Sequence, residues 1–149
     1  MAWKIQVQTK EPKDFSLVNC DTLATENSTS PIIQENLAMQ FIPLETEDQL
    51  KEIKEAKGLN VIFKHNTTCP ISKGVRSRFE EEADSLPDVQ SVYFIDLLAH
   101  RNISDAIAEE FDVEHQSPQL LLIKDGTCTY NEALYDISVQ ATTEAIRDN

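Results

Sequence analysis

The sequence predicts an α/β fold in which a mixed central sheet is flanked by helices. Short apolar segments typical of strands alternate with segments whose apolar residues recur at helical spacing. Towards the C-terminus, Asp125-Gly126 lies between two strand-like segments and is a hairpin signal, which adds antiparallel pairing to the parallel pairing of helical crossovers. Between these regions, a Cys69-Pro70 pair follows a buried strand and opens a helix.

The N-terminal part of the chain differs from the rest in composition. Residues 1–39 are polar, with a loop-like stretch around Asn27–Pro31 and one strand-like segment at Trp3–Val7. A chain of 149 residues is long enough for one domain with a real core and too short for two ordinary ones. We therefore expect a polar N-terminal extension over residues 1–39 and a single folded domain over residues 40–149.

The regular pattern begins with an edge strand and a helix. Phe41–Leu44 predicts a short edge strand, because only an edge position tolerates a proline. Thr46 followed by Gln49 is a capping box that begins a helix, and Gly58 marks the end of that helix. Val61–Phe63 predicts a buried strand that leads to Cys69.

The middle of the domain predicts two further helices separated by a strand. A helix begins at Cys69-Pro70 and ends before Pro87, and Ser91–Asp96 predicts the strand that follows it. The apolar residues expected to face inward from the two helices are Ile71, Val75, Phe79 and Ala83 in the first, and Ile103, Ile107 and Phe111 in the second.

The C-terminal part predicts a β-hairpin and a last helix. Gln119–Lys124 is an apolar strand, and Thr127–Tyr130 should return beside it in the antiparallel direction. Ser138 caps the final helix, which runs to about residue 147 and buries Val139 and Ile146.

The resulting order β-α-β-α-β-α-β-β-α, with Cys-Pro at the start of the second helix, is that of a thioredoxin-like fold. In that fold a proline beside the active site is usually cis, and Pro118 precedes the appropriate strand. The backbone of Ser117 would then pair with the peptide edge of a bound thiol compound.

The position of Cys69 favours a reactive thiolate. A helix N-terminus presents unpaired N–H groups and the positive end of the helix dipole. The segment from Val61 to Phe79 contains no acidic residue and carries four basic ones, Lys64, Lys73, Arg76 and Arg78, whereas the rest of the chain holds all 26 acidic residues against nine basic ones. We expect this basic segment to surround Cys69 and to attract an anionic small thiol or disulfide.

Composition excludes several other classes of protein. The net charge of -13 argues against nucleic acid as a partner, because phosphates need a cationic footprint. No apolar stretch approaches the length of a membrane span, and the N-terminus lacks the apolar region of a secretory signal, so we expect a cytoplasmic protein with no membrane partner. Cys20, Cys69 and Cys128 are odd in number and widely spaced, which predicts reduced thiols and no metal site.

Three separated motifs resemble the YtxJ family of monothiol bacilliredoxins. They are Phe63–Ser72, Ser104–Phe111 and Ser117–Gly126, within a likeness that covers about residues 40 to 148. The resemblance implies a thioredoxin fold and removal of bacillithiol from mixed disulfides on proteins, with the small thiol as co-substrate and no bound cofactor. It also implies Cys69 as the nucleophile, Thr68, Pro70 and Ile71 as the rest of its motif, and Pro118 as the cis proline.

The residue three positions after Cys69 sets the reaction type. Ser72 stands where dithiol oxidoreductases carry a second cysteine, and a serine cannot resolve a mixed disulfide. The thiolate of Cys69 would therefore take the small thiol from an S-thiolated client protein and keep it until a second free thiol removes it. We expect Thr67, Lys73, Ser117 and Pro118 to contact the substrate.

The remaining cysteines and histidines have mainly structural interpretations. Cys128 lies at the hairpin end away from Pro118 and is expected to be a packed, inert thiol, whereas Cys20 in the extension keeps a resolving or regulatory role open. His65 either stabilises the thiolate or, as we favour, packs at the end of its strand. His100 and His115 have no partners at metal-ligand spacing.

Two other functions stay open. The pattern His65-Asn66-x-x-Cys69-x-x-Ser72 is similar to the active-site turn of glutaredoxin-like arsenate reductases, although Lys73 stands where those enzymes carry an arginine that binds the oxyanion. A phosphatase-type anion loop is excluded, because six residues separate Cys69 from Arg76 where that loop has five. The alternative outside catalysis is a redox-sensing adaptor that binds a protein partner through its acidic surface.

Overall fold

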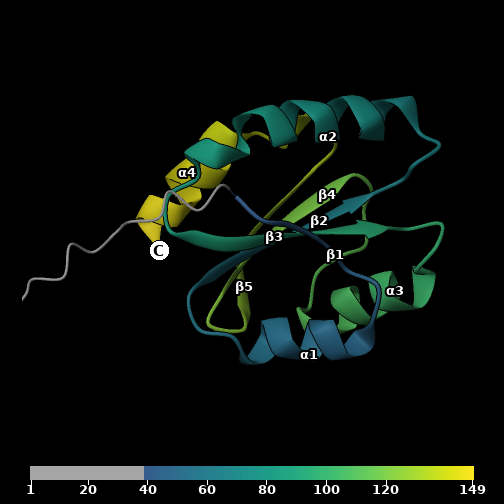
Figure 1. Cartoon of the computed structure of the whole chain (residues 1–149), viewed down its shortest axis with the longest axis horizontal. Helices are drawn as coiled ribbons and strands as arrows, with labels where there is room; N and C mark the ends of the chain where they lie inside the picture. Colours follow the sequence, from purple (N-terminus) through teal and green to yellow (C-terminus); the bar gives the residue numbers. More distant parts are fainter. Residues whose placement is uncertain (1–38) are drawn as a thin grey trace, which may run out of the picture. The chain divides into compact units, whose positions relative to one another are not determined.

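The computed structural model describes residues 39–149, which form a five-stranded sheet with helices on both faces (Figure 1). The strands are β1 (Phe41–Pro43), β2 (Leu59–His65), β3 (Val89–Asp96), β4 (Gln119–Lys124) and β5 (Thr127–Ala133). The helices are α1 (Glu47–Glu55), α2 (Pro70–Glu82), α3 (Arg101–Glu110) and α4 (Val139–Asp148), with short 3-10 turns at Ala83–Ser85 and Leu134–Asp136. The strand-like segment at Trp3–Val7 and Cys20 lie outside the described residues.

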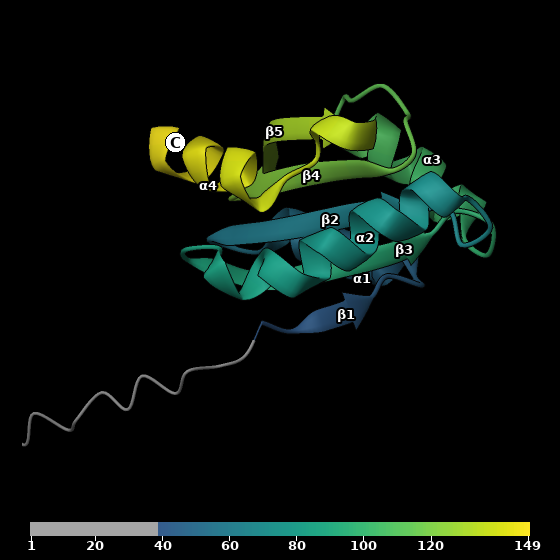
Figure 2. The ribbon, with the colours of Figure 1, turned by 90° about the horizontal axis from the view of Figure 1, so that it is seen from above.

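The sheet is mixed, as predicted. Its strand order is β1-β3-β2-β4-β5, with β3 parallel to both β1 and β2, and β4 antiparallel to both β2 and β5. Helices α2 and α4 cover one face and α1 and α3 the other, which is visible in Figure 1 and from above in Figure 2. No helix within residues 39–149 is long and apolar enough to cross a membrane.

Alternation along β2 divides the core into two apolar layers. Val61 and Phe63 belong to the layer beneath α2 and α4, whereas Ile62 belongs to the layer that α1 and α3 cover. Burial of β2 on both faces explains why its sequence is a continuous apolar run rather than an alternating one.

Several local sequence signals are confirmed in detail. The backbone N–H of Gln49 donates to the hydroxyl of Thr46 at 3.3 Å and the Gln49 side chain accepts from the Thr46 N–H at 3.1 Å, which completes the capping box. Asp125 and Gly126 both have positive φ, at 50° and 79°, as a tight hairpin turn requires. The peptide bond between Ser117 and Pro118 is cis.

The prediction that Ile71 faces inward is wrong. Its side chain is 40% exposed; the buried residues of α2 are Ser72, Val75 and Phe79, so the apolar part of the buried stripe begins with Val75. Figure 1 shows α2 starting beyond the end of β2, so the first turn of the helix has no sheet beneath it. Ile71 instead forms an apolar surface beside Cys69.

Candidate active site

Cys69 is the N-cap residue of α2, at the end of the sheet where β2 and β3 finish. Its backbone is extended, and the first intrahelical bond runs from the Lys73 N–H to the Cys69 carbonyl at 3.0 Å. Pro70 has no N–H, and the N–H groups of Ile71 and Ser72 precede the first intrahelical bond. A thiolate at the N-cap is therefore placed to accept from these donors, as capping oxygens do. The thiol is half-buried, and the first turn of α2 contains no acidic residue that would compete for them.

The turn that carries Cys69 is organised by Asn66. The Asn66 carboxamide oxygen accepts from the Thr68 N–H at 2.9 Å and from the Thr68 hydroxyl at 2.8 Å, while its carbonyl accepts from the Cys69 N–H at 3.2 Å. This is an Asx turn of the kind that asparagine forms before a helix. Sequence reasoning missed Asn66, although an Asn followed by two threonines and Cys-Pro is a turn signal.

Ser72 holds this turn against the helix. Its side chain is fully buried, and its hydroxyl oxygen accepts from the Asn66 N–H at 2.9 Å. The Ser72 hydroxyl therefore bonds the first turn of α2 to the residue that follows β2. Ser72 has this structural role in addition to occupying the position of a second cysteine.

The residues that flank the turn come from β3 and from the segment before β4. The Thr67 hydroxyl donates to the Asp96 carboxylate at 3.1 Å, and Asp96 also accepts from the Leu98 N–H at 3.0 Å, so the end of β3 is tied to the turn. On the other flank, buried Pro118 accepts through its carbonyl from the Leu134 N–H at 2.9 Å. The hydroxyl of the neighbouring Ser117 is buried and has no hydrogen-bond partner among residues 39–149.

His65 is a packed residue at the end of β2, in agreement with the structural role favoured from its position. It is only 4% exposed, and its Nε2 lies 2.9 Å from Nη1 of Arg76. A guanidinium only donates, so Nε2 accepts and the ring proton lies on Nδ1. Burial, and secondarily the charge of Arg76, lower the pKa of His65 below its usual 6.5, which keeps the ring neutral near pH 7.

The basic segment does not converge on Cys69 as expected. Arg76 pairs with Glu80 at 2.8 Å and lies 4.4 Å above the ring of Phe94, and Arg78 donates to the Ile137 carbonyl at 2.8 Å. Lys73 and Arg78 are both exposed and have no carboxylate within 4.0 Å in residues 39–149, but Arg78 is held by main-chain carbonyls, whereas the Lys73 ammonium has no hydrogen-bond partner there. The number of basic residues along the sequence does not reveal these packing roles. Of the four, Lys73 is the residue whose side chain is left without a partner in the described part of the chain, and it lies near the thiol.

Lys64 is the fourth of these basic residues and lies in the core. It is fully buried on the face that α3 covers, where its ammonium contacts Nδ1 of His115 at 3.0 Å and the Ser104 carbonyl at 3.4 Å. Burial lowers the pKa of Lys64 from its usual 10.5 to about 8, against the opposing influence of Asp105. The alternation of β2 turns this residue away from α2.

The second cysteine of the described region lies in the other apolar layer. Cys128 packs on β5 against the layer under α1 and α3, and burial raises the pKa of its thiol. Its predicted role as a packed, inert thiol agrees with this position. Within residues 39–149, no three side chains of His, Cys, Asp or Glu are grouped in a way that would hold a metal ion.

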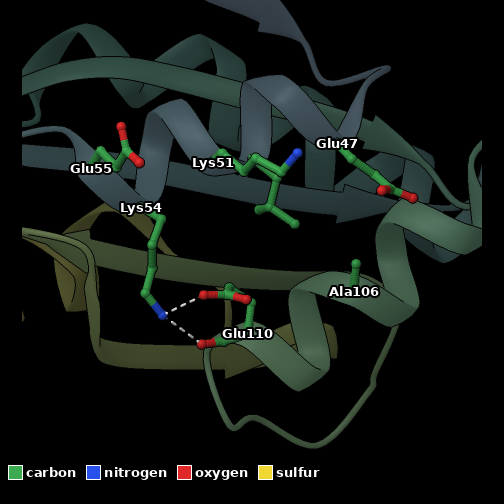
Figure 3. A pocket seen from close by; sticks show the side chains of 7 residues that line it. Glu47, Lys51, Lys54, Glu55, Ala106 and Glu110 are labelled. Carbon is green, nitrogen blue, oxygen red and sulfur yellow. Dashed lines mark hydrogen bonds and ion pairs between the residues drawn. The ribbon is translucent and has the colours of Figure 1, made fainter.

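A pocket on the face opposite α2 has no feature of a reaction site. It lies between α1 and α3 and has a volume of about 290 Å³ (Figure 3). The ammonium of Lys54 reaches across it to a carboxylate oxygen of Glu110 at 2.8 Å and to the Glu110 carbonyl at 2.9 Å. These contacts join the two helices, and the sheet separates them from Cys69.

Comparison with solved structures places this architecture among thioredoxin-fold proteins. A protein described as a candidate oxidoreductase with a thioredoxin fold is 28% identical, covers 71% of this chain and 93% of its own, and superposes with a TM-score of 0.65. Thioredoxin from Trypanosoma brucei brucei, at 15% identity, covers 74% of this chain and 91% of its own with a TM-score of 0.62. Mitochondrial thioredoxin 3 from Saccharomyces cerevisiae, at 17% identity, covers 73% and 95% with a TM-score of 0.59.

The fold, with a cysteine at the N-terminus of α2 and a cis proline before β4, defines a thioredoxin-fold thiol oxidoreductase. A family model described as monothiol bacilliredoxin BrxC matches residues 42–142. The chain belongs to this monothiol bacilliredoxin family, which confirms the resemblance seen in the sequence motifs.

The hydroxyl of Ser72 should stabilise the fold measurably. Ser72→Ala leaves the Asn66 N–H without its acceptor, so we expect the free energy of unfolding to fall by about 1–3 kcal/mol. Urea unfolding followed by circular dichroism measures this change. Ser77→Ala, on the exposed side of the same helix, is the matched control and should change stability by less than about 0.5 kcal/mol. Equal effects of the two substitutions would contradict the bracing role.

Lys64 should make stability depend on pH above neutrality. Its pKa is about 8 in the folded protein and 10.5 when unfolded, so between these values the unfolded chain binds more protons and stability rises with pH. We expect the stability of the wild type to increase relative to Lys64→Met as pH is raised from about 7 to about 10. Urea titrations across this range test it, with Lys51→Met as an exposed control. A difference between wild type and Lys64→Met that is independent of pH would disprove the assignment.

Proposed function

We propose that the protein removes a low-molecular-weight thiol from mixed disulfides on client proteins by single-cysteine exchange through Cys69. The Cys69 thiolate attacks the sulfur of the small thiol, a new disulfide forms between them, and the client leaves as a thiolate. A second free small thiol then attacks the Cys69 mixed disulfide, which restores the Cys69 thiolate and releases a symmetrical small-thiol disulfide. Each step exchanges one S–S bond for another, so no further oxidant or reductant is required.

The observation that carries this proposal is the N-cap position of Cys69 with serine three residues later. The Cys69 side chain makes no capping hydrogen bond, so the N–H groups of the first turn remain available to a thiolate, and Ser72 supplies a buried hydroxyl where a dithiol enzyme has its resolving sulfur. Cys128 does not replace it, because it packs in the layer on the other side of the sheet. Among residues 39–149 no second thiol can displace the captured small thiol, so in this proposal a thiol from solution removes it.

The flank at Ser117 and Pro118 supports the expected contact with a substrate backbone. Both residues precede β4, and the Ser117 hydroxyl is buried without a partner in the described part of the chain. A bound peptide edge beside the cis bond would supply that partner. Bacillithiol is the small thiol we propose, from the family match, and a reducing compartment such as the cytoplasm is the expected setting.

Replacing the proposed nucleophile should abolish the reaction. We expect Cys69→Ser to lose essentially all release of small thiol from an S-thiolated model protein, because the hydroxyl is not ionised near neutral pH. Release is measured by mass spectrometry of the model protein. Cys128→Ser is the matched control and should retain wild-type rates. Full activity in Cys69→Ser would refute the proposal, and an internal disulfide between Cys69 and Cys20 would instead favour the redox-sensing adaptor.

Introducing a second thiol should change how the small thiol leaves. In Ser72→Cys the new sulfur lies one helical turn from Cys69, as in dithiol oxidoreductases, so it can displace the captured thiol internally. We expect this variant to release the small thiol with no added free thiol, whereas the wild type retains a stable adduct. Intact-protein mass spectrometry after removal of excess disulfide distinguishes the two. An adduct on wild-type Cys69 that disappears without added thiol would contradict the single-cysteine mechanism.

A further inference from the structure

A groove runs along the β3 side of the active-site turn, on the flank away from Pro118. It consists of two adjoining hollows that share His65, Thr67 and Arg76. The hollow next to α2, of about 250 Å³, is lined by His65, Thr67, Lys73, Arg76, Ser77 and Glu80. The other, of about 340 Å³, extends past Phe94 to β1. We call the two together the β3-side groove.

The groove begins within one helical turn of the thiol. Thr67 lies two residues before Cys69, and Lys73 follows Cys69 by four residues, with its N–H bonded to the Cys69 carbonyl. Side chains four apart on a helix are neighbours on one face. A compound joined to the Cys69 sulfur therefore has this hollow within its reach.

One residue of the groove lining has a buried ring nitrogen with no hydrogen-bond partner in the described residues. His65 lines both hollows and is 4% exposed, and its Nδ1, which carries the ring proton, has no hydrogen-bond partner among residues 39–149. Buried polar groups without partners are uncommon and costly in folded proteins. The other two residues that line both hollows are already engaged, since the Arg76 guanidinium pairs with Glu80 and the Thr67 hydroxyl with Asp96.

In the hollow next to α2, the cations Lys73 and Arg76 outnumber the single carboxylate of Glu80. Glu45 and Asp96 line the other hollow. Glu80 offsets Arg76, whereas Lys73 has no carboxylate within 4.0 Å in residues 39–149. The chain as a whole has a net charge of -13, whereas Lys73 places a positive charge, unpaired among the described residues, near the candidate nucleophile. A carboxylate is the group that this cation, together with neighbouring N–H and O–H donors, would bind.

We propose that the hollow next to α2 receives the carboxylate-bearing end of the small thiol while its sulfur is bonded to Cys69, with Lys73 as the cation that binds the carboxylate. This inference rests on the proposed function and assigns the client protein and the small thiol to different flanks of the site. The Pro118 flank accepts the backbone of the client, and the opposite flank selects the small thiol by its charge. Thiols with a carboxylate are preferred over neutral or cationic ones of equal size.

The test compares mixed disulfides of Cys69 that differ in charge. The full-length protein is equilibrated at low salt with the disulfides of 3-mercaptopropionate, 2-mercaptoethanol and cysteamine, and the adduct at Cys69 is quantified by peptide mass spectrometry. In each case Cys69 attacks the added disulfide and releases one thiolate. We expect the anionic adduct to be favoured over the neutral one by about two- to fivefold, the range for an exposed ion pair, and the preference to shrink at high salt.

Matched variants locate the cause of this preference. Lys73→Gln should remove it, whereas Lys57→Gln, the same charge change in the loop before β2, should retain it. Ser77→Trp fills the hollow beside Lys73 and should weaken the adduct of glutathione more than that of 2-mercaptoethanol. Gln140→Trp on the exposed side of α4 should change neither.

The outcomes separate this inference from the proposed function. Adducts at Cys69 with no charge preference, or a preference that survives Lys73→Gln, would overturn the groove assignment and leave single-cysteine exchange standing. A preference lost in Lys73→Gln but indifferent to Ser77→Trp would overturn the role of the groove in favour of charge alone. Failure of Cys69 to form any adduct would overturn both.

Discussion

The site depends on one short hydrogen-bonded link between the end of β2 and the first turn of α2. The Ser72 hydroxyl accepts from the Asn66 N–H, and Asn66 in turn orders Thr68 and the Cys69 N–H. The sheet gives β2 a rigid end and the helix gives unpaired N–H groups, but neither alone orients the sulfur. The link between Asn66 and Ser72 makes them one unit.

The packing around this unit explains why local charge is a poor guide to the environment of the thiol. Arg76 is anchored by Glu80, His65 and the ring of Phe94, so its main contribution is to hold α2 on the sheet. Lys64 lies on the far side of the sheet altogether. Basic residues that are neighbours in the sequence therefore have unrelated structural roles, because strand and helix geometry place them on different faces.

Much of the fold could be predicted because it depends on local patterns. The capping box at Thr46, the hairpin at Asp125-Gly126 and the alternation of strands and helices each leave a signal within a few residues. The place of Cys69 at the start of α2 follows from the Cys-Pro pair. The family match over residues 42–142 agrees with the motifs read from the chain.

The parts that could not be predicted depend on contacts between elements. Burial of Lys64 requires knowing that β2 is covered on both faces and that α3 brings the Ser104 carbonyl to meet it. Exposure of Ile71 depends on where α2 begins relative to the end of the sheet, which helical periodicity does not reveal. The contact between His65 and Arg76 joins the end of β2 to α2, and local sequence patterns do not predict how the intervening turn brings them together.

The position of Cys128 on β5, in the layer under α1 and α3, also has a kinetic consequence for the proposed cycle. Because no thiol among residues 39–149 other than Cys69 lies at the start of α2, the lifetime of a captured thiol in the proposed cycle is set by collisions with free thiol. The fraction of Cys69 that holds a small thiol then depends on the concentration of free thiol around the protein. A high concentration of reduced thiol would remove the small thiol from Cys69 quickly, and a low concentration would leave the mixed disulfide in place.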